Sequence, residues 1–210
     1  MRTDIVHSGA DELVYEIRGV AAAAEVIARE GKRVIWENIG DPIAKGHRVP
    51  EWIKDLVAAK LRQDRVFGYS PTRGLDRTRE FIVEQRRREG GAALSKDDIL
   101  FFNGLGDAIS IIYTYLNPAA RVIGPSPAYP THSSAEASHG NSPHITYSLN
   151  PDRDWLPDME NLRNHIKYNP TIAGILIINP DNPTGMVYPR EILKQMVDLA
   201  REFDLFLISD

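Results

Sequence analysis

The chain has 210 residues, of which 42% are hydrophobic and 26% are charged, and its formal net charge is -4. This composition is typical of a folded globular protein and excludes a disordered chain. The small negative charge argues against a surface dedicated to nucleic acid or to anionic lipid, because both partners reward clustered Lys and Arg. We therefore expect no nucleic-acid partner and no membrane partner.

Cysteine is absent from the sequence, so neither a disulfide nor a thiolate for catalysis or zinc binding is available. The histidines show no close ligand pair, and His132 and His139 are better explained as two turns of one helix than as a metal site. The N-terminal residues lack a signal-peptide core, and no apolar stretch approaches the roughly 20 residues of a membrane span. These features predict a cytoplasmic protein.

The first 90 residues read mostly as helices and turns. Apolar residues recur at helical spacing over residues 13–30, and Gly31 follows as a stop signal. A short extended segment at 34–36 leads into the turn at 39–42. Two further helices are expected at about 50–63 and 74–89.

From about residue 99 the pattern changes to alternating strands and helices. The expected strands are 99–102, 121–124, 144–147, 172–178 and 205–209, and the expected helices are 107–116, 130–139, 158–168 and 189–203. Apolar runs separated by helical segments predict a mostly parallel sheet with helices on both faces. The fold class is therefore α/β, and we expect an N-terminal region, 1–45, followed by a larger domain, 46–210.

Polar and glycine-rich loops follow the predicted strands. They are 103–108 (NGLGDA), 125–130 (PSPAYP) and 179–185 (NPDNPTG), and Asp210 follows the last strand. Each has a plain structural explanation as a turn, a packed anchor or a helix cap. Ligands of open parallel sheets, however, gather outside the carboxyl ends of the strands. Together the loops supply an anion cradle, a flat ring, an amide and a carboxylate, which suit a phosphorylated aromatic heterocycle.

The loop at 179–185 carries a family resemblance. The pattern N-P-x-N-P-T-G is specific to the class I and II aminotransferases, the fold-type I enzymes that depend on pyridoxal phosphate, and the sequence resembles that family. Three further segments resemble its motifs: 39–42 (IGDP), 69–75 (YSPTRGL) and 125–130 (PSPAYP). The resemblance implies the large domain of that fold, with residues 1–45 contributing to the small domain.

The resemblance also implies a binding site for pyridoxal 5'-phosphate. Backbone N–H groups of Gly104, Leu105 and Gly106 would bind its phosphate, as a helix N-terminus favours an anion. The family usually has Ser or Thr after this glycine pair, where the chain has Asp107. Tyr129 would stack on the pyridine ring.

Two polar side chains would bind the ring itself. Asn182 would bond the phenolic oxygen, and Asp210 would pair with the ring nitrogen. A carboxylate there keeps the nitrogen protonated, so that the ring takes up the electrons released when the substrate Cα loses a proton. Asp210, Asn182 and Tyr129 are therefore the candidate catalytic residues.

Other residues would contact the substrate or a second subunit. Gly40 would lie near the substrate carboxylate, where a larger side chain would crowd it, and Asn182 would also bind substrate. Tyr69 would reach the phosphate held by a neighbouring subunit, which implies a homodimer.

No lysine of the chain falls in the context of the family's Schiff-base lysine. The lysines are Lys32, Lys45, Lys54, Lys60, Lys96, Lys167 and Lys194, and each is more simply a surface residue. We expect the Schiff-base lysine and the substrate-binding arginine beyond residue 210. The chain would then be the N-terminal part of a longer aminotransferase and inactive alone.

Three functions stay open at this point. The leading one is transfer of an amino group from an amino acid to a 2-oxo acid. A lyase or decarboxylase on the same fold is the second, since fold does not fix the reaction, and a non-catalytic aminotransferase-like regulatory domain is the third. The segment 15–19 (YEIRG) resembles the start of alanine-type aminotransferases, which favours alanine and pyruvate with glutamate and 2-oxoglutarate as substrates.

Overall fold

The structure, a computed structural model, describes residues 6, 9–10, 13, 16–37 and 39–210. Backbone contacts divide the chain into two compact units: Met1–Val26 with Gly104–Asp210, and Ile27–Asn103. The domain boundary expected near residue 45 stays a prediction. The first expected helix is observed as α1 (Glu16–Arg29), while residues 14 and 15 of that helix lie outside the described residues.

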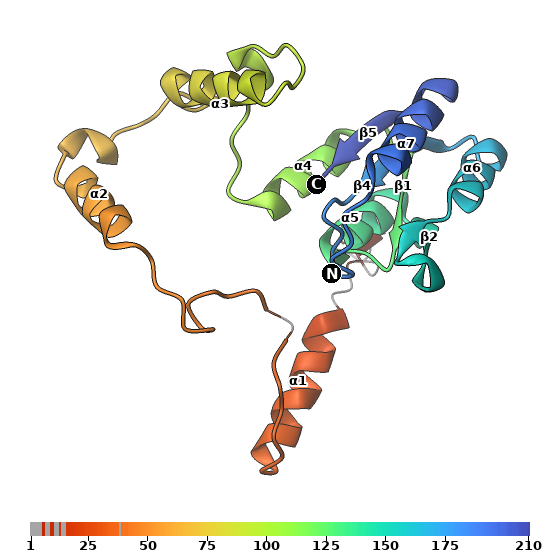
Figure 1. Cartoon of the computed structure of the whole chain (residues 1–210), viewed down its shortest axis with the longest axis horizontal. Helices are drawn as coiled ribbons and strands as arrows, with labels where there is room; N and C mark the ends of the chain where they lie inside the picture. The colour runs from red at the N-terminus through yellow and green to blue at the C-terminus, as the bar shows by residue number, and fades with distance from the viewer. Residues whose placement is uncertain (1–5, 7–8, 11–12, 14–15, 38) are drawn as a thin grey trace, which may run out of the picture. The chain divides into compact units, whose positions relative to one another are not determined.

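The larger unit is built on a five-stranded sheet (Figure 1). Its strands are β1 (Arg121–Ser126), β2 (Ile145–Asn150), β3 (Leu156–Pro157), β4 (Ile172–Ile177) and β5 (Phe206–Ser209), in the order β3-β2-β1-β4-β5. All neighbouring strands pair in parallel except β3, which is antiparallel to β2. The helices are α4 (Leu105–Tyr115), α5 (Pro130–Gly140), α6 (Met159–Tyr168) and α7 (Arg190–Glu202). The predicted α/β fold is confirmed.

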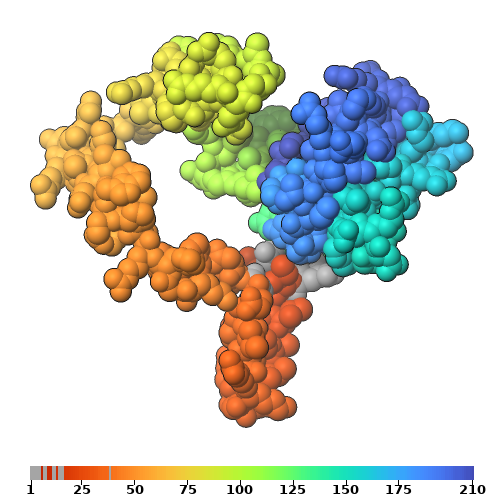
Figure 2. Space-filling model, viewed as in Figure 1, coloured from red at the N-terminus to blue at the C-terminus, as the bar shows by residue number. Residues whose placement is uncertain are grey.

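The apolar run of β4 fills a core on each face of the sheet. Ile175 and Ile177 belong to the cluster that includes residues of α6 and α7, whereas Leu176 belongs to the cluster that includes residues of α4. Successive side chains of a strand point to opposite faces, so an unbroken apolar run serves both. Figure 2 shows α6 in cyan and α7 in blue side by side, as their contacts require.

A tyrosine hydroxyl compensates for a proline in the central strand. Tyr147 of β2 is fully buried and donates from its hydroxyl to the carbonyl of Leu176 in β4 at 3.0 Å. Pro125 of β1, the strand between them, has no N–H to offer. The carbonyl is thereby satisfied inside the core.

The smaller unit contains no strand among the residues that the structure describes. Its helices are α2 (Glu51–Leu61) and α3 (Asp76–Arg88), with short 3-10 segments at Asp64–Phe67 and Lys96–Asp98. α2 buries none of its residues, and α3 buries Arg79, which bonds the Lys96 carbonyl and Asp76. No helix in the described part of the chain is both long and apolar enough to cross a bilayer.

The strand expected at 99–102 is wrong. The 3-10 segment ends at Asp98, and residues 99–102 form no strand. Backbone N–H and C=O groups of a strand need a paired neighbour, and this segment belongs to the smaller unit, where none of the described residues provides one. The ring of Phe101 instead lies against Gly74, where a Cβ would come within 2.3 Å of it.

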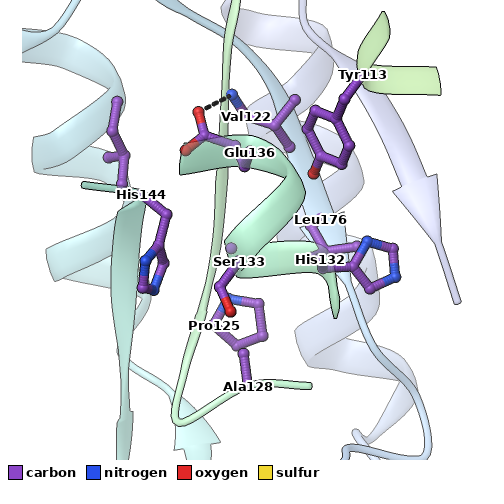
Figure 3. A pocket seen from close by; sticks show the side chains of 11 residues that line it. Tyr113, Val122, Pro125, Ala128, His132, Ser133, Glu136, His144 and Leu176 are labelled. Atoms are coloured by element: carbon purple, nitrogen blue, oxygen red, sulfur yellow. Dashed lines mark hydrogen bonds between the residues drawn. The ribbon is translucent and has the colours of Figure 1, made fainter. Parts of the chain in front are cut away.

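A buried ion pair holds α5 against the start of β1. Glu136 is 2% exposed and accepts from Arg121 Nε at 2.5 Å and from its terminal nitrogen at 2.8 Å. The carboxylate also accepts from the backbone N–H of Val122, drawn as a dashed line in Figure 3. The hydrogen bond to Glu136 raises the pKa of Arg121, so the guanidinium stays charged.

We expect Glu136→Gln to lower the free energy of unfolding by about 3 kcal/mol, because it leaves the Arg121 charge buried without its partner. Glu202→Gln is the matched control. Glu202 also pairs with an arginine, Arg163, but both side chains are 48% exposed, and such pairs contribute roughly 0–1 kcal/mol. Urea unfolding of both variants of the complete polypeptide measures the difference, and equal losses would contradict the assignment.

Candidate active site

The carboxyl ends of β1, β4 and β5 lie at one edge of the sheet, and the segments that follow them line a single cleft. β1 pairs with β2 on one side and with β4 on the other, so the strand order reverses there. Ligands of open parallel sheets bind at such a switch point. The cleft has a volume of about 440 Å³ and is lined by Leu105, Tyr129, Ile178, Asn179, Pro180, Asn182 and Asp210.

Four of the predicted site residues meet at this cleft: Leu105, Tyr129, Asn182 and Asp210. Gly104 and Gly106 flank Leu105 at the start of α4. The remaining two, Gly40 and Tyr69, belong to the smaller unit and are exposed.

The backbone of Asp210 is joined to the end of β4. Its N–H donates to the carbonyl of Ile177 at 2.9 Å, and its carbonyl accepts from the N–H of Asn179 at 3.0 Å. These bonds continue the pairing of β4 and β5 beyond both strands. They fix the Asp210 carboxylate beside the loop at 179–185.

The Asp210 carboxylate is held by a buried histidine. His132 Nε2 lies 3.1 Å from Asp210 Oδ2, and His132 is 2% exposed. Burial lowers the pKa of His132, and the bond and charge of Asp210 oppose that shift only in part. His132 is therefore neutral at neutral pH. Because an ionised carboxylate can only accept, Nε2 carries the proton and donates it.

His132 also supports the aromatic side of the cleft. The rings of Tyr129 and His132 lie edge to face, with centroids 6.3 Å apart, an arrangement that aromatic rings favour. A cavity of about 10 Å³ adjoins His132 (Figure 3), with Tyr113, Ser133 and Leu176 in its wall. Within the described part of the chain, Nδ1 of His132 is buried without a hydrogen-bond partner. The imidazole is thus oriented through Nε2 and its ring contact.

In the loop at 179–185 the acid is buried and the neighbouring amide is exposed. Asp181 is 3% exposed, and its Oδ2 accepts from the hydroxyl of Thr184 at 2.6 Å and from its N–H at 3.2 Å. The N–H of Gly185 donates to the Asp181 carbonyl at 2.8 Å. The side chain that bonds its own turn is therefore Asp181. Asn182 is exposed and lines the cleft.

The start of α4 offers room and backbone donors. Gly104 precedes the helix with a φ of 91°, a conformation that favours glycine. A Cβ at Gly104 or Gly106 would meet no atom within 4 Å. The first N–H groups of a helix and its dipole favour an anion, although Asp107 adds a negative charge in this first turn.

The donors and acceptors of the cleft fit pyridoxal phosphate. The Asp210 carboxylate suits a protonated ring nitrogen, the Asn182 amide suits a ring oxygen, and Tyr129 offers a flat face. The helix start suits a phosphate, because it adds backbone N–H donors with open space above two glycines.

Sequence reasoning missed His132 as a site residue. The interpretation of His132 and His139 as two turns of one helix is confirmed, because both lie in α5. The contact with Asp210, however, joins residues 78 positions apart, which helical periodicity does not show. The available signal was spacing: His132 follows Tyr129 by three residues at the beginning of a helix, so both side chains lie on one face.

Comparison with known proteins identifies the family. The sequence model of the family "aminotransferase class I and II" matches residues 33–210. An uncharacterized aminotransferase of Methanocaldococcus jannaschii is 55% identical over 210 residues, which is all of this chain and 49% of the relative. The glutamate-pyruvate aminotransferase AlaA of Escherichia coli K12 is 33% identical over 203 residues, covering 95% of this chain and 49% of that protein.

Solved structures give the same result. An alanine aminotransferase from Pyrococcus furiosus superposes with a TM-score of 0.86 at 28% identity, covering all of this chain and 52% of that one. An aminotransferase from Escherichia coli superposes with a TM-score of 0.85 at 31% identity, covering 51% of its chain. The predicted fold type is confirmed, and the chain spans about half the length of the curated relatives it matches. The chain belongs to the class I and II aminotransferases.

Proposed function

We propose that the complete protein containing this chain transfers an amino group from an amino acid to a 2-oxo acid, with pyridoxal phosphate held in the cleft. The observation that carries the proposal is the meeting of Asp210, Asn182 and Tyr129 in one cleft at the switch point of the sheet. Membership of the aminotransferase family supports it.

Asp210 has the central chemical task. When bound, pyridoxal phosphate supplies an aldehyde that reacts with the substrate amine and a ring that takes up electrons from Cα. The Asp210 carboxylate holds a proton on the ring nitrogen, because a negative charge in contact favours the cationic form. His132 orients this carboxylate by donating to Oδ2.

The other residues of the cleft bind and orient. Asn182 would donate from its amide to the ring oxygen, and Tyr129 would cover one face of the ring. Backbone N–H groups of Gly104, Leu105 and Gly106 would hold the phosphate at the start of α4. Fixing the ring in this way aligns the reacting bond, which is where positioning contributes most to rate.

Alanine and pyruvate, with glutamate and 2-oxoglutarate, are the proposed substrates. Relatives that share 33–34% identity are named glutamate-pyruvate aminotransferase and alanine aminotransferase, which supports this choice. Asn182 and Gly40 would contact the amino acid. The lysine that binds the cofactor and shuttles the proton would come from a segment outside these 210 residues.

A homodimer in the cytoplasm is also proposed. Tyr69 is fully exposed on the smaller unit, as a residue that reaches the phosphate of a second subunit would be before assembly. The absence of cysteine suits a reducing compartment.

We expect Asp210→Asn to lower the turnover of the complete polypeptide by at least about a hundredfold, because a neutral amide cannot hold the ring nitrogen protonated. Turnover is measured with alanine and 2-oxoglutarate. Asp198→Asn is the control, since Asp198 is an exposed residue of α7 paired with Lys194. Full turnover in Asp210→Asn would contradict the proposed function.

We expect the stability of the protein to fall as the pH is lowered through about 6.5. The pKa of His132 is lower in the folded chain than in the unfolded chain, so the unfolded chain binds the proton more readily. The free energy of unfolding therefore decreases as the pH falls. His132→Gln keeps a donor for Asp210 but does not titrate, and should flatten this part of the profile. The urea midpoint of unfolding, measured between about pH 5 and pH 8, gives the pH dependence of stability. His165→Gln, at an exposed histidine, is the control. An unchanged profile in His132→Gln would refute the role given to His132.

A further inference from the structure

We propose that Tyr188 is a positioning residue for Asn182, acting through the buried carboxylate of Asp181. The inference rests on the proposed function, because it concerns the side chain assigned to the cofactor ring. Tyr188 follows the loop at 179–185 in the chain and precedes α7. It belongs to no motif that sequence reasoning singled out.

Tyr188 binds the loop at two points. Its hydroxyl donates to Asp181 Oδ1 at 3.2 Å, and its backbone N–H donates to Asn179 Oδ1 at 2.9 Å. The side chain is 2% exposed and packs in the core formed by β1, β2, β4, α6 and α7. The first residues of the loop are thereby tied to the rigid interior of the larger unit.

Thr184, within the loop, binds the second carboxylate oxygen of Asp181. Its hydroxyl and N–H donate to Asp181 Oδ2, while the same hydroxyl accepts from the N–H of Met186 at 3.2 Å. The N–H of Asp181 donates to the Met186 carbonyl at 2.8 Å. Both carboxylate oxygens of Asp181 therefore have donors: Tyr188 donates to Oδ1, and Thr184 donates to Oδ2.

Among the residues that the structure describes, the donors to the Asp181 carboxylate come from Thr184 and Tyr188 and are neutral groups. A buried carboxylate held by neutral donors loses a large part of its stabilisation when any one of them is removed. The loop therefore has one strongly preferred conformation, in which Asp181 points inward. Asn182, the next residue, is then held outward into the cleft, so that the Tyr188 hydroxyl sets the position of an amide that it does not touch.

Cofactor affinity tests this role separately from stability. The complete polypeptide, freed of cofactor, is titrated with pyridoxal phosphate, and the dissociation constant is measured by absorbance. Tyr188→Phe is expected to raise this constant roughly three- to tenfold, the size of a coupling between neighbouring groups. Tyr147→Phe is the matched control, because it removes the hydroxyl of an equally buried tyrosine whose bond goes to the Leu176 carbonyl. It should change the constant less than about twofold.

A double-mutant cycle shows whether Tyr188 acts through Asn182. Asn182→Ala removes the amide, so adding Tyr188→Phe to it should weaken binding no further. If Tyr188 only stabilised the fold, its effect would persist in that background. Additive effects of the two substitutions would therefore overturn the inference.

Thr184 supplies a second route if Tyr188→Phe does not fold. Thr184→Val removes the hydroxyl and is expected to weaken cofactor binding by a similar factor, whereas Thr184→Ser keeps the hydroxyl and should restore it. Equal affinity in the two variants would overturn the inference.

The proposed function and this inference fail in different ways. If the unaltered polypeptide binds no pyridoxal phosphate, both are overturned. If it binds but Tyr188→Phe binds equally well, the function stands and only the role of Tyr188 is overturned.

Discussion

Two backbone hydrogen bonds at the end of β5 hold the cleft together. They join Asp210 to Ile177 and to Asn179, at 2.9 and 3.0 Å, and so place the acid and the loop at 179–185 side by side. Their geometry follows from the register of β4 and β5, in which Ile177 pairs with Ser209. A slip of one residue would turn Asp210 to the opposite face of the sheet. The site therefore depends on strand register before it depends on any side chain.

One face of α5 contacts both the first residue of β1 and the residue that follows β5. His132 and Glu136 are four residues apart and so lie on the same helix face. Glu136 binds Arg121, the first residue of β1, while His132 binds Asp210, which follows β5. The buried ion pair fixes where the helix sits, and the histidine is then presented at the carboxyl end of the strands. The ion pair that holds the helix and the hydrogen bond that orients Asp210 thus come from consecutive turns of α5.

Features determined by local sequence were predictable, and those determined by distant contacts were not. Strands β1, β2, β4 and β5 followed from apolar runs, whereas the two-residue β3 (Leu156–Pro157) was not predicted. Tyr129, Asn182 and Asp210 followed from the motifs at the strand ends, and the structure gathers these three in one cleft. The failed strand at 99–102 has the apolar composition of a strand but no described partner, and composition does not show pairing. The bond between His132 and Asp210 spans 78 positions, beyond the reach of any periodicity.

The order of Asp181 and Asn182 within the motif has a physical basis. The two side chains have nearly the same shape, yet the acid is buried and the amide lines the cleft. Thr184 and Tyr188 donate to the two carboxylate oxygens of Asp181. An asparagine at position 181 would have one oxygen to accept from them, and its NH₂ group would face the other donor without an acceptor. An acid at position 182 would in turn place a second negative charge in the cleft with Asp210, and like charges at close range raise each other's pKa. The carboxylate therefore belongs beneath the cleft and the amide within it.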